Sequence, residues 1–244
     1  MFEKVILHGT INNHSIKKIM KYIIGNWKSN KDSREVTIWF ETFAKLYKKN
    51  KTGKLNNLKV IICPSFVQLV QAKQLVISHN LPIKLGAQDV SPFANGPYTG
   101  EVSATQLKEL VEYVVIGHSE RRNNFQENGG LLVQKAAMAI KERLKPIFCI
   151  QGPKTTIPPG VSIAAYEPVW AIGSGTAETP ENAAKIARQV KQNKLANLVV
   201  YGGSVTPENV CGFLAGSSID GILAGGVSLD PVKFWQIIVN AASL

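Results

Sequence analysis

Three residues that follow apolar runs in distant parts of the chain have side chains suited to acid–base chemistry. Lys28 follows the run that ends at Gly25, His118 follows one that ends at Gly117, and Glu167 lies between an apolar run and a proline. A carboxylate in such a place either pairs with a cation or serves as a general base. A lysine, a histidine and a glutamate from three distant parts of the chain could converge on one small substrate.

Each of the three also has an ordinary structural interpretation. Lys28 alone is more simply a solvated lysine after a strand, because lysine is uncommon inside proteins. A lone histidine such as His118 more often caps a neighbouring carbonyl than it catalyses. The chemical interpretation depends on all three meeting at one place, and the elements of the chain must therefore bring them together.

Eight short apolar runs recur along the chain, most of them separated by stretches of helical period. They are Tyr22–Gly25, Leu58–Cys63, Ile83–Ala87, Tyr113–Gly117, Pro146–Ile150, Ser162–Tyr166, Leu198–Gly202 and Gly221–Ala224. Runs without alternation are typical of parallel strands covered on both faces. The order predicts an α/β fold, a closed (β/α)8 TIM barrel, in which functional groups lie at the carboxyl ends of the strands. A doubly wound sheet is the alternative, but no GxGxxG motif follows the first run.

Helix starts are marked by a capping residue and a proline at Thr179-Pro180, Thr206-Pro207 and Asp230-Pro231. The connection from residue 151 to 160 is too short and too rich in proline for a helix. We therefore expect the helix between the fifth and sixth strands to be reduced to a short loop, with the barrel flank covered in another way.

Glycine pairs follow the last two runs, at Gly202-Gly203 and at Gly225-Gly226. Turns are the default interpretation of such pairs. Barrels, however, commonly bind phosphate at this place through backbone N–H groups, which glycine lets approach the anion closely. The small residues from 171 to 175 would suit a hinged lid, although an ordinary loop would look similar.

Composition restricts the class of protein. The 244 residues are 45% hydrophobic and 18% charged, which excludes disorder. No apolar run approaches the ~18 residues of a membrane span, and no signal peptide is evident, so we predict a cytoplasmic protein. The formal charge of +11 comes largely from lysines between residues 45 and 59. A solvated surface explains them better than a nucleic-acid or membrane partner. Three scattered cysteines predict no disulfide framework and no metal site.

Several motifs, in order from about residue 21 to the C-terminus, resemble the triosephosphate isomerase family. They are Gly25-Asn26-Trp27-Lys28, Gly117-His118-Ser119-Glu120-Arg121-Arg122, Ala165-Tyr166-Glu167-Pro168-Val169-Trp170-Ala171-Ile172-Gly173, Tyr201-Gly202-Gly203-Ser204-Val205 and Asp220-Gly221-Ile222-Leu223-Ala224-Gly225-Gly226. The resemblance implies interconversion of dihydroxyacetone phosphate and D-glyceraldehyde 3-phosphate through an enediolate, in glycolysis and gluconeogenesis.

The resemblance also implies roles for individual residues. Glu167 would shuttle the proton between substrate carbons, and His118, as a neutral imidazole, would polarise the carbonyl. Lys28, with Asn26 beside it, would stabilise the negative charge of the enediolate and phosphate. The phosphate would rest on backbone N–H groups of four residues: Gly173, Ser204, Gly225 and Gly226. No metal or organic cofactor would be needed.

A lid would close over the bound substrate and exclude water. Its residues would be Pro168, Val169, Trp170, Ala171, Ile172, Gly173, Ser174, Gly175, Thr176, Ala177 and Glu178. Ile172 and Leu223 would keep water from the Glu167 carboxylate, and Tyr201 would latch the closed lid.

The segment Gln88–Glu101 resembles the loop through which family members form homodimers. Thr99 would reach into the partner's pocket, and Glu101 would pair with the partner's Arg121. A tetramer stays open, because short family members without the fifth helix include tetramers.

The chain departs from the family pattern in four places. The fifth helix is absent and Gln151-Gly152 follows the fifth strand; the bulky Glu178 ends the lid; and Asp89 stands where asparagine is usual. Residues 1–19 lie outside the match as an N-terminal extension of unknown structure, and Met20 is an alternative start. Residues 20–244 are expected to form a single barrel domain.

Two other functions stay open. A different phosphate-binding barrel enzyme would keep the glycine pairs but would need a larger pocket than a three-carbon substrate does. A catalytically idle scaffold that exploits the positive charge would have lost one of the three candidate catalytic side chains, and all three are present.

Overall fold

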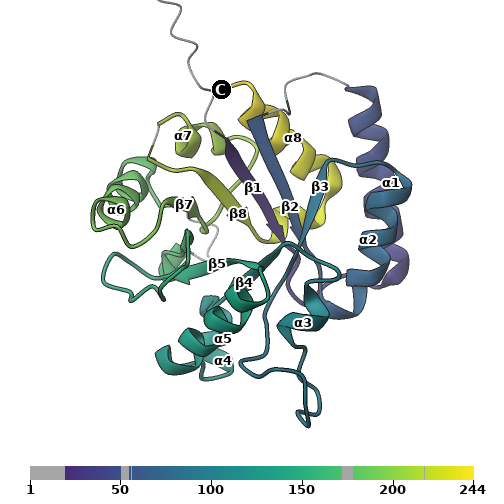
Figure 1. The fold of residues 1–244 in the computed structure, drawn as a ribbon. Coiled ribbons are helices and arrows are strands. Elements are labelled where there is room, and N and C mark those ends of the chain that lie inside the picture. Colours follow the sequence, from purple (N-terminus) through teal and green to yellow (C-terminus); the bar gives the residue numbers. More distant parts are fainter. Residues whose placement is uncertain (1–19, 51–54, 56, 172–177, 217) are drawn as a thin grey trace, which may run out of the picture.

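A computed structural model describes residues 20–50, 55, 57–171, 178–216 and 218–244. Eight parallel strands pair in chain order and close into a barrel (Figure 1). The strands are β1 (Lys21–Asn26), β2 (Leu58–Cys63), β3 (Ile83–Ala87), β4 (Tyr113–Ile116), β5 (Lys145–Ile150), β6 (Ile163–Tyr166), β7 (Leu198–Tyr201) and β8 (Gly221–Ala224). The predicted (β/α)8 fold is confirmed.

Helices surround the barrel as an outer layer (Figure 1). The α-helices are α1 (Ser33–Lys49), α2 (Leu69–Ser78), α3 (Ala104–Leu107), α4 (Ser119–Asn124), α5 (Gly129–Lys141), α6 (Pro180–Gln192), α7 (Val210–Leu214) and α8 (Pro231–Ala242). Short 3₁₀ turns are η2 (Phe66–Gln68), η3 (Val169–Ala171) and η4 (Gly226–Leu229).

Two apolar layers explain why apolar and polar residues do not alternate along the strands. Successive strand residues point to opposite sides of the sheet, so Ile24 and Ile61 fill the barrel interior while Ile23 and Val60 pack against the helices. Both sets are buried. Burial on both faces is what the unbroken apolar runs predict, and it leaves the strand ends as the place for polar side chains.

Two of the three predicted helix starts are confirmed. Helix α6 begins at Pro180, with the Thr179 side chain accepting a backbone hydrogen bond, and α8 begins at Pro231 after the Asp230 cap. The third is wrong, because α7 begins at Val210 and not at Pro207. The Thr206 hydroxyl still accepts a hydrogen bond from the backbone N–H of Asn209, at 3.3 Å. This bond stabilises a turn that precedes the helix.

Between β5 and β6 the described residues 151–162 contain no helix, as predicted. The side chains of Ile157 and Val161 are buried in the outer apolar layer and cover part of this flank. The Arg122 guanidinium lies 5.7 Å from the centre of the Phe148 ring on β5. Apolar side chains of a short loop thus cover part of the flank that a helix covers elsewhere around the barrel.

No helix within the described ranges is long and apolar enough to span a membrane. The predicted extension over residues 1–19 lies outside the described residues.

The three thiols are expected to differ sharply in reactivity toward iodoacetamide, because the thiolate is the reactive form. Burial raises the pKa of Cys63 to about 12. Burial, followed by the nearby Glu167 carboxylate, raises the pKa of Cys149 well above its ordinary value. Cys211 is only half-buried. Mass spectrometry of the native protein at pH 8 should therefore find label on Cys211 alone, and on all three thiols after denaturation. Fast native labelling of Cys63 or Cys149 would contradict this burial.

Candidate active site

A cavity of about 250 Å³ opens at the carboxyl ends of β1, β7 and β8. This volume is below the ~300 Å³ typical of the smallest drug-sized sites, so it suits a ligand of a few atoms. Its lining combines cationic, imidazole and backbone groups: Asn26, Lys28, His118, Gly202, Gly203, Ser204, Val205, Thr206, Leu223, Gly225, Gly226 and Val227.

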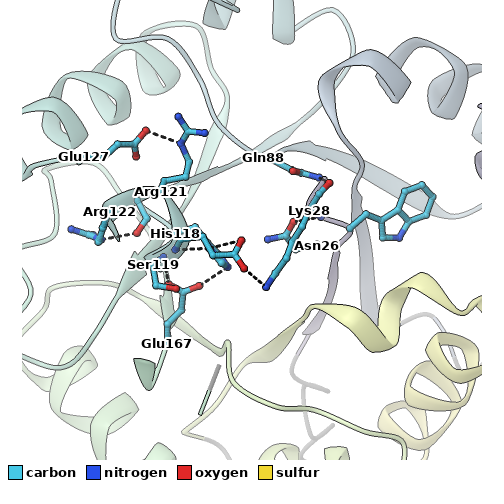
Figure 2. A network of polar contacts seen from close by, with 12 residues as sticks. Asn26, Lys28, Gln88, His118, Ser119, Arg121, Arg122, Glu127 and Glu167 are labelled. Atoms are coloured by element: carbon cyan, nitrogen blue, oxygen red, sulfur yellow. Dashed lines mark hydrogen bonds and ion pairs between the residues drawn. The ribbon is translucent and has the colours of Figure 1, made fainter. Parts of the chain in front are cut away.

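Lys28 adopts the left-handed backbone conformation, with φ 54°, which is uncommon for a non-glycine residue. Its backbone N–H donates to Asn26 Oδ1 at 3.0 Å, and its carbonyl accepts from Gln88 Nε2 at 2.8 Å. The same Gln88 amide also donates to the Cys63 carbonyl at 2.9 Å. The Lys28 ammonium lies 2.5 Å from Glu120 Oε1. Lys28 is therefore fixed at both its backbone and its charged end (Figure 2).

His118 caps the N-terminus of α4, and its proton position follows from that place. The preceding Gly117 has φ 71°, which turns the chain sharply from β4 into the helix. The backbone N–H of Glu120 donates to His118 Nδ1 at 3.2 Å. A nitrogen that accepts a hydrogen bond carries no proton, so in the neutral imidazole the proton lies on Nε2.

The Glu167 carboxylate lies against this imidazole and is only 1% exposed. Its Oε2 accepts the backbone N–H of Ser119 at 2.9 Å. Its Oε1 lies 2.9 Å from His118 Nε2 but is not aligned for a hydrogen bond, and within the described residues it has no hydrogen-bond partner. A buried carboxylate oxygen without a partner still has its capacity to accept a hydrogen bond or a proton unused. Figure 2 shows the two side chains facing each other.

The glycine pair after β8 is held by its neighbour Ser228. The Ser228 hydroxyl donates to the Gly225 carbonyl at 2.6 Å. The Ser228 carbonyl in turn accepts both indole N–H groups of Trp27 and Trp39, at 3.2 and 3.0 Å. This buried anchor fixes the turn whose glycines line the cavity, and such preformed turns bind anions at low cost.

Tyr201, the predicted latch, folds back over the glycine pair after β7. A Cβ at Gly203 would lie 2.2 Å from the Tyr201 hydroxyl oxygen, so any larger residue there would displace the Tyr201 ring. That hydroxyl accepts the backbone N–H of Glu178 at 3.0 Å. Glu178 is buried, and its Oε2 accepts from the Tyr166 hydroxyl at 3.2 Å and from Asn182 Nδ2 at 2.8 Å. The end of the predicted lid is thus tied to the barrel by charged and phenolic groups.

Comparison with known proteins agrees with this geometry. The triosephosphate isomerase family model matches residues 21–160 and 159–241. The chain belongs to the triosephosphate isomerase family. It is 40% identical to the triosephosphate isomerase of Thermodesulfovibrio yellowstonii over 89% of this chain and 98% of that protein. It is 39% identical to that of Mesomycoplasma hyopneumoniae strain 232 over 91% of this chain and 99% of that protein.

The two stretches of the family match meet at residues 159–160, inside the connection from β5 to β6. This is where the described chain has a loop in place of a helix. The break in the match and the missing helix therefore have the same location.

The structure brings part of the predicted site together around the cavity. Lys28, His118, Asn26, Ser204, Gly225, Gly226 and Leu223 all line the cavity. Glu167 does not line it, because its carboxylate is turned toward Ser119 behind the imidazole. The predicted lid residues Ile172, Gly173, Ser174, Gly175, Thr176 and Ala177 lie outside the described residues. Of the described lid residues, Pro168 is buried while Val169 and Trp170 are exposed.

The sequence analysis named Gln88 as the start of the proposed dimer loop and Ser119 and Glu120 within a family motif, but gave none of them a role in the site. The structure shows what each contacts: Gln88 holds the Lys28 carbonyl, Ser119 holds Glu167, and Glu120 contacts both Lys28 and His118. Adjacency to a candidate catalytic residue was the available signal for the last two.

A buried cluster of four charged groups next to the site was missed altogether. Lys135 Nζ lies 2.7 Å from both carboxylate oxygens of Asp89 and 2.5 Å from Glu127 Oε1. The Arg121 guanidinium contacts the same two acids, at 2.9 and 2.7 Å. The Lys135 and Glu127 side chains are 5% and 2% exposed. Lys135 lies among apolar residues of α5, and a lysine in such a run was the signal for a buried partner.

We expect the Asp89→Asn variant to gain stability relative to the parent as the pH rises from 4 to 7. Burial is the largest effect on Asp89 and raises its pKa above 3.8, although Lys135 and Arg121 oppose the rise and Glu127 adds to it. An acid whose folded pKa is raised stabilises the fold only while protonated, and this contribution is lost as the pH rises through the raised value. Asparagine carries no such proton, so it avoids the loss.

Urea unfolding of both proteins at several pH values between 4 and 7 measures this difference. If the free energy of unfolding of the parent instead rises relative to that of the variant as the pH rises, the prediction is wrong. The attraction of Lys135 and Arg121 for the Asp89 carboxylate would then outweigh the effect of burial.

Proposed function

We propose that this chain interconverts dihydroxyacetone phosphate and D-glyceraldehyde 3-phosphate by proton transfer through an enediolate. One observation carries the proposal: the unpartnered Oε1 of buried Glu167 lies 2.9 Å from the Nε2 of an imidazole whose other nitrogen accepts a hydrogen bond. A base and a neutral donor held together in this way suit removal of a proton beside a carbonyl. Membership of the triosephosphate isomerase family supports the same reaction.

In the proposed reaction Glu167 takes a proton from the carbon beside the carbonyl. The electron pair left behind moves onto the carbonyl oxygen, and the resulting enediolate accepts the hydrogen bond of His118 Nε2–H. A proton then passes between the two substrate oxygens through the imidazole, and Glu167 returns its proton to the neighbouring carbon. For this, the Glu167 carboxylate must leave the Ser119 N–H and turn toward the cavity. The Lys28 ammonium, at the cavity wall, balances the developing negative charge.

The phosphate would lie against the backbone of Ser204, Gly225 and Gly226, all of which line the cavity. Gly173, the fourth proposed contact, lies in the lid and outside the described residues. Closure of residues 168–178 would exclude water, which keeps the intermediate from losing its phosphate. The bond from Glu178 N–H to the Tyr201 hydroxyl supports Tyr201 as the latch.

We propose that the active form is a homodimer built through residues 88–101. This loop precedes α3 and extends away from the barrel (Figure 1). Within it the Phe93 and Tyr98 rings stack at 4.2 Å and stay 42% and 41% exposed. Two exposed aromatic rings on one projecting loop are typical of an interface. Arg121, proposed to meet the partner's Glu101, already contacts Asp89 and Glu127 of its own chain. A tetramer is the alternative assembly. We also propose that the enzyme works in the cytoplasm, where it would catalyse its step of glycolysis.

The Glu167→Gln variant should lose about three orders of magnitude or more in kcat, because the amide keeps the shape of the side chain but cannot accept the proton. A coupled assay of isomerisation in both directions measures this loss. The matched control is Glu181→Gln, which makes the same chemical change at the exposed first turn of α6 and should leave kcat within twofold. Parent-like turnover by Glu167→Gln would refute the proposed base.

Sedimentation velocity should give the parent at least twice the 26.6 kDa mass of one chain. Replacing Phe93 and Tyr98 together by aspartate should shift the protein to monomer and lower its activity. Val232→Asp, which places the same charge at another exposed apolar residue, is the control and should not change the mass. A monomeric, active parent would refute the proposed dimer.

A further inference from the structure

The buried charged cluster lies one peptide bond from a residue that holds Lys28. Gln88 follows β3 directly, and both of its amide N–H groups are used, one on the Lys28 carbonyl and one on the Cys63 carbonyl. The next residue is Asp89, whose carboxylate oxygens each lie 2.7 Å from Lys135 Nζ. The position of the Asp89 backbone therefore sets where the Gln88 amide can reach.

The same cluster is also linked to the charged end of Lys28, through the residue that precedes Arg121. Arg121, which contacts Asp89 at 2.9 Å, directly follows Glu120 on α4. The Glu120 carboxylate lies 2.5 Å from the Lys28 ammonium. Asp89 is thus connected to Lys28 in two ways. Gln88 connects it to the Lys28 backbone, and Arg121 and Glu120 connect it to the Lys28 ammonium group.

A lysine does not favour φ 54° by itself, so contacts from other residues help to hold Lys28 in this conformation. Its neighbour Asn26 contributes one hydrogen bond, to the Lys28 N–H. The carbonyl on the other side is held by Gln88. A small shift of Gln88 would release that carbonyl, and the ammonium group would move away from the cavity wall.

We propose that the Asp89–Lys135 ion pair positions Lys28 for the reaction. This inference rests on the proposed function and assigns two residues to it that never touch the substrate. Lys135 comes from α5 and Asp89 from the loop after β3, so the pair fixes that loop against the helix layer. Both side chains are nearly inaccessible, at 5% and 11% exposure, and their partners Arg121 and Glu127 keep the cluster electrically neutral.

The test is the double variant Asp89→Leu with Lys135→Met. It removes one charge of each sign, so Arg121 and Glu127 remain paired. Replacing a buried ion pair by apolar residues is often neutral or stabilising, so the melting temperature should stay equal or rise. We nevertheless expect kcat/KM to fall roughly ten- to a hundredfold, because a displacement of about 1 Å is enough for such losses. Affinity for 2-phosphoglycolate, whose carboxylate resembles the enediolate, should fall in parallel.

A double-mutant cycle with Gln88→Ala separates positioning from general packing. If the ion pair acts through Gln88, replacing the pair in the Gln88→Ala background should lower kcat/KM by less than a further twofold. The control removes a distant surface pair, Lys108→Gln with Glu142→Gln, and should leave kcat/KM unchanged. If the apolar double variant does not fold, Asp89→Asn with Lys135→Gln replaces it in the same cycle.

Crystal structures of the parent and the double variant make the outcome independent of turnover. We expect Lys28 to leave the left-handed region in the variant and to lose its bond to Gln88. A folded variant with Lys28 unchanged would overturn the inference, and so would the same activity loss in both backgrounds together with an intact Lys28–Glu120 ion pair. A parent chain that does not isomerise triose phosphates would refute the proposed function, while the position of Lys28 would still decide the role of the ion pair.

Discussion

The hydrogen bond from the Glu120 N–H to His118 Nδ1 is the contact on which the chemistry of the site depends. It exists because α4 begins directly at the end of β4, so that the first free N–H groups of the helix point at the imidazole. This contact fixes the imidazole proton on Nε2, the nitrogen that faces Glu167 and the cavity. A charged imidazole would neutralise the Glu167 carboxylate, whereas a neutral donor leaves the carboxylate free to act as a base.

The closed barrel supplies the rest of the arrangement. Because β1, β4 and β6 are parallel, residues that are far apart in the chain meet at one rim, and the interior below them is filled with apolar side chains. At that rim Lys28 and Gly117 both have positive φ. The apolar layers hold such local distortions in place, since their packing leaves no alternative path for the chain.

Much of this could be predicted from the sequence. The runs over 58–63, 83–87 and 221–224 match β2, β3 and β8 at both ends, because burial on both faces leaves an unmistakable apolar signal. The predicted runs for β4, β5, β6 and β7 differ from these strands by one residue at one end, and the run for β1 by one residue at each end. The start of α7 was wrong, because a Thr-Pro-Glu-Asn segment caps a turn as well as it caps a helix.

Contacts between side chains could not be predicted in the same way. Nothing in the spacing of Asp89 and Lys135 shows that they meet, because the path of the loop after β3 decides it. The turn of Glu167 toward Ser119 likewise depends on a rotamer, which periodicity does not encode. Sequence patterns therefore predicted the candidate residues and their place at the carboxyl ends of the strands. The structure shows which residues they contact.

Nitrogen-15 NMR of histidine-labelled protein tests the central claim most directly. At pH 7 the account predicts that His118 has an unprotonated Nδ1 and a proton on Nε2, in the parent and in Glu167→Gln alike. A protonated Nδ1, whether as the other neutral tautomer or as imidazolium, would contradict it.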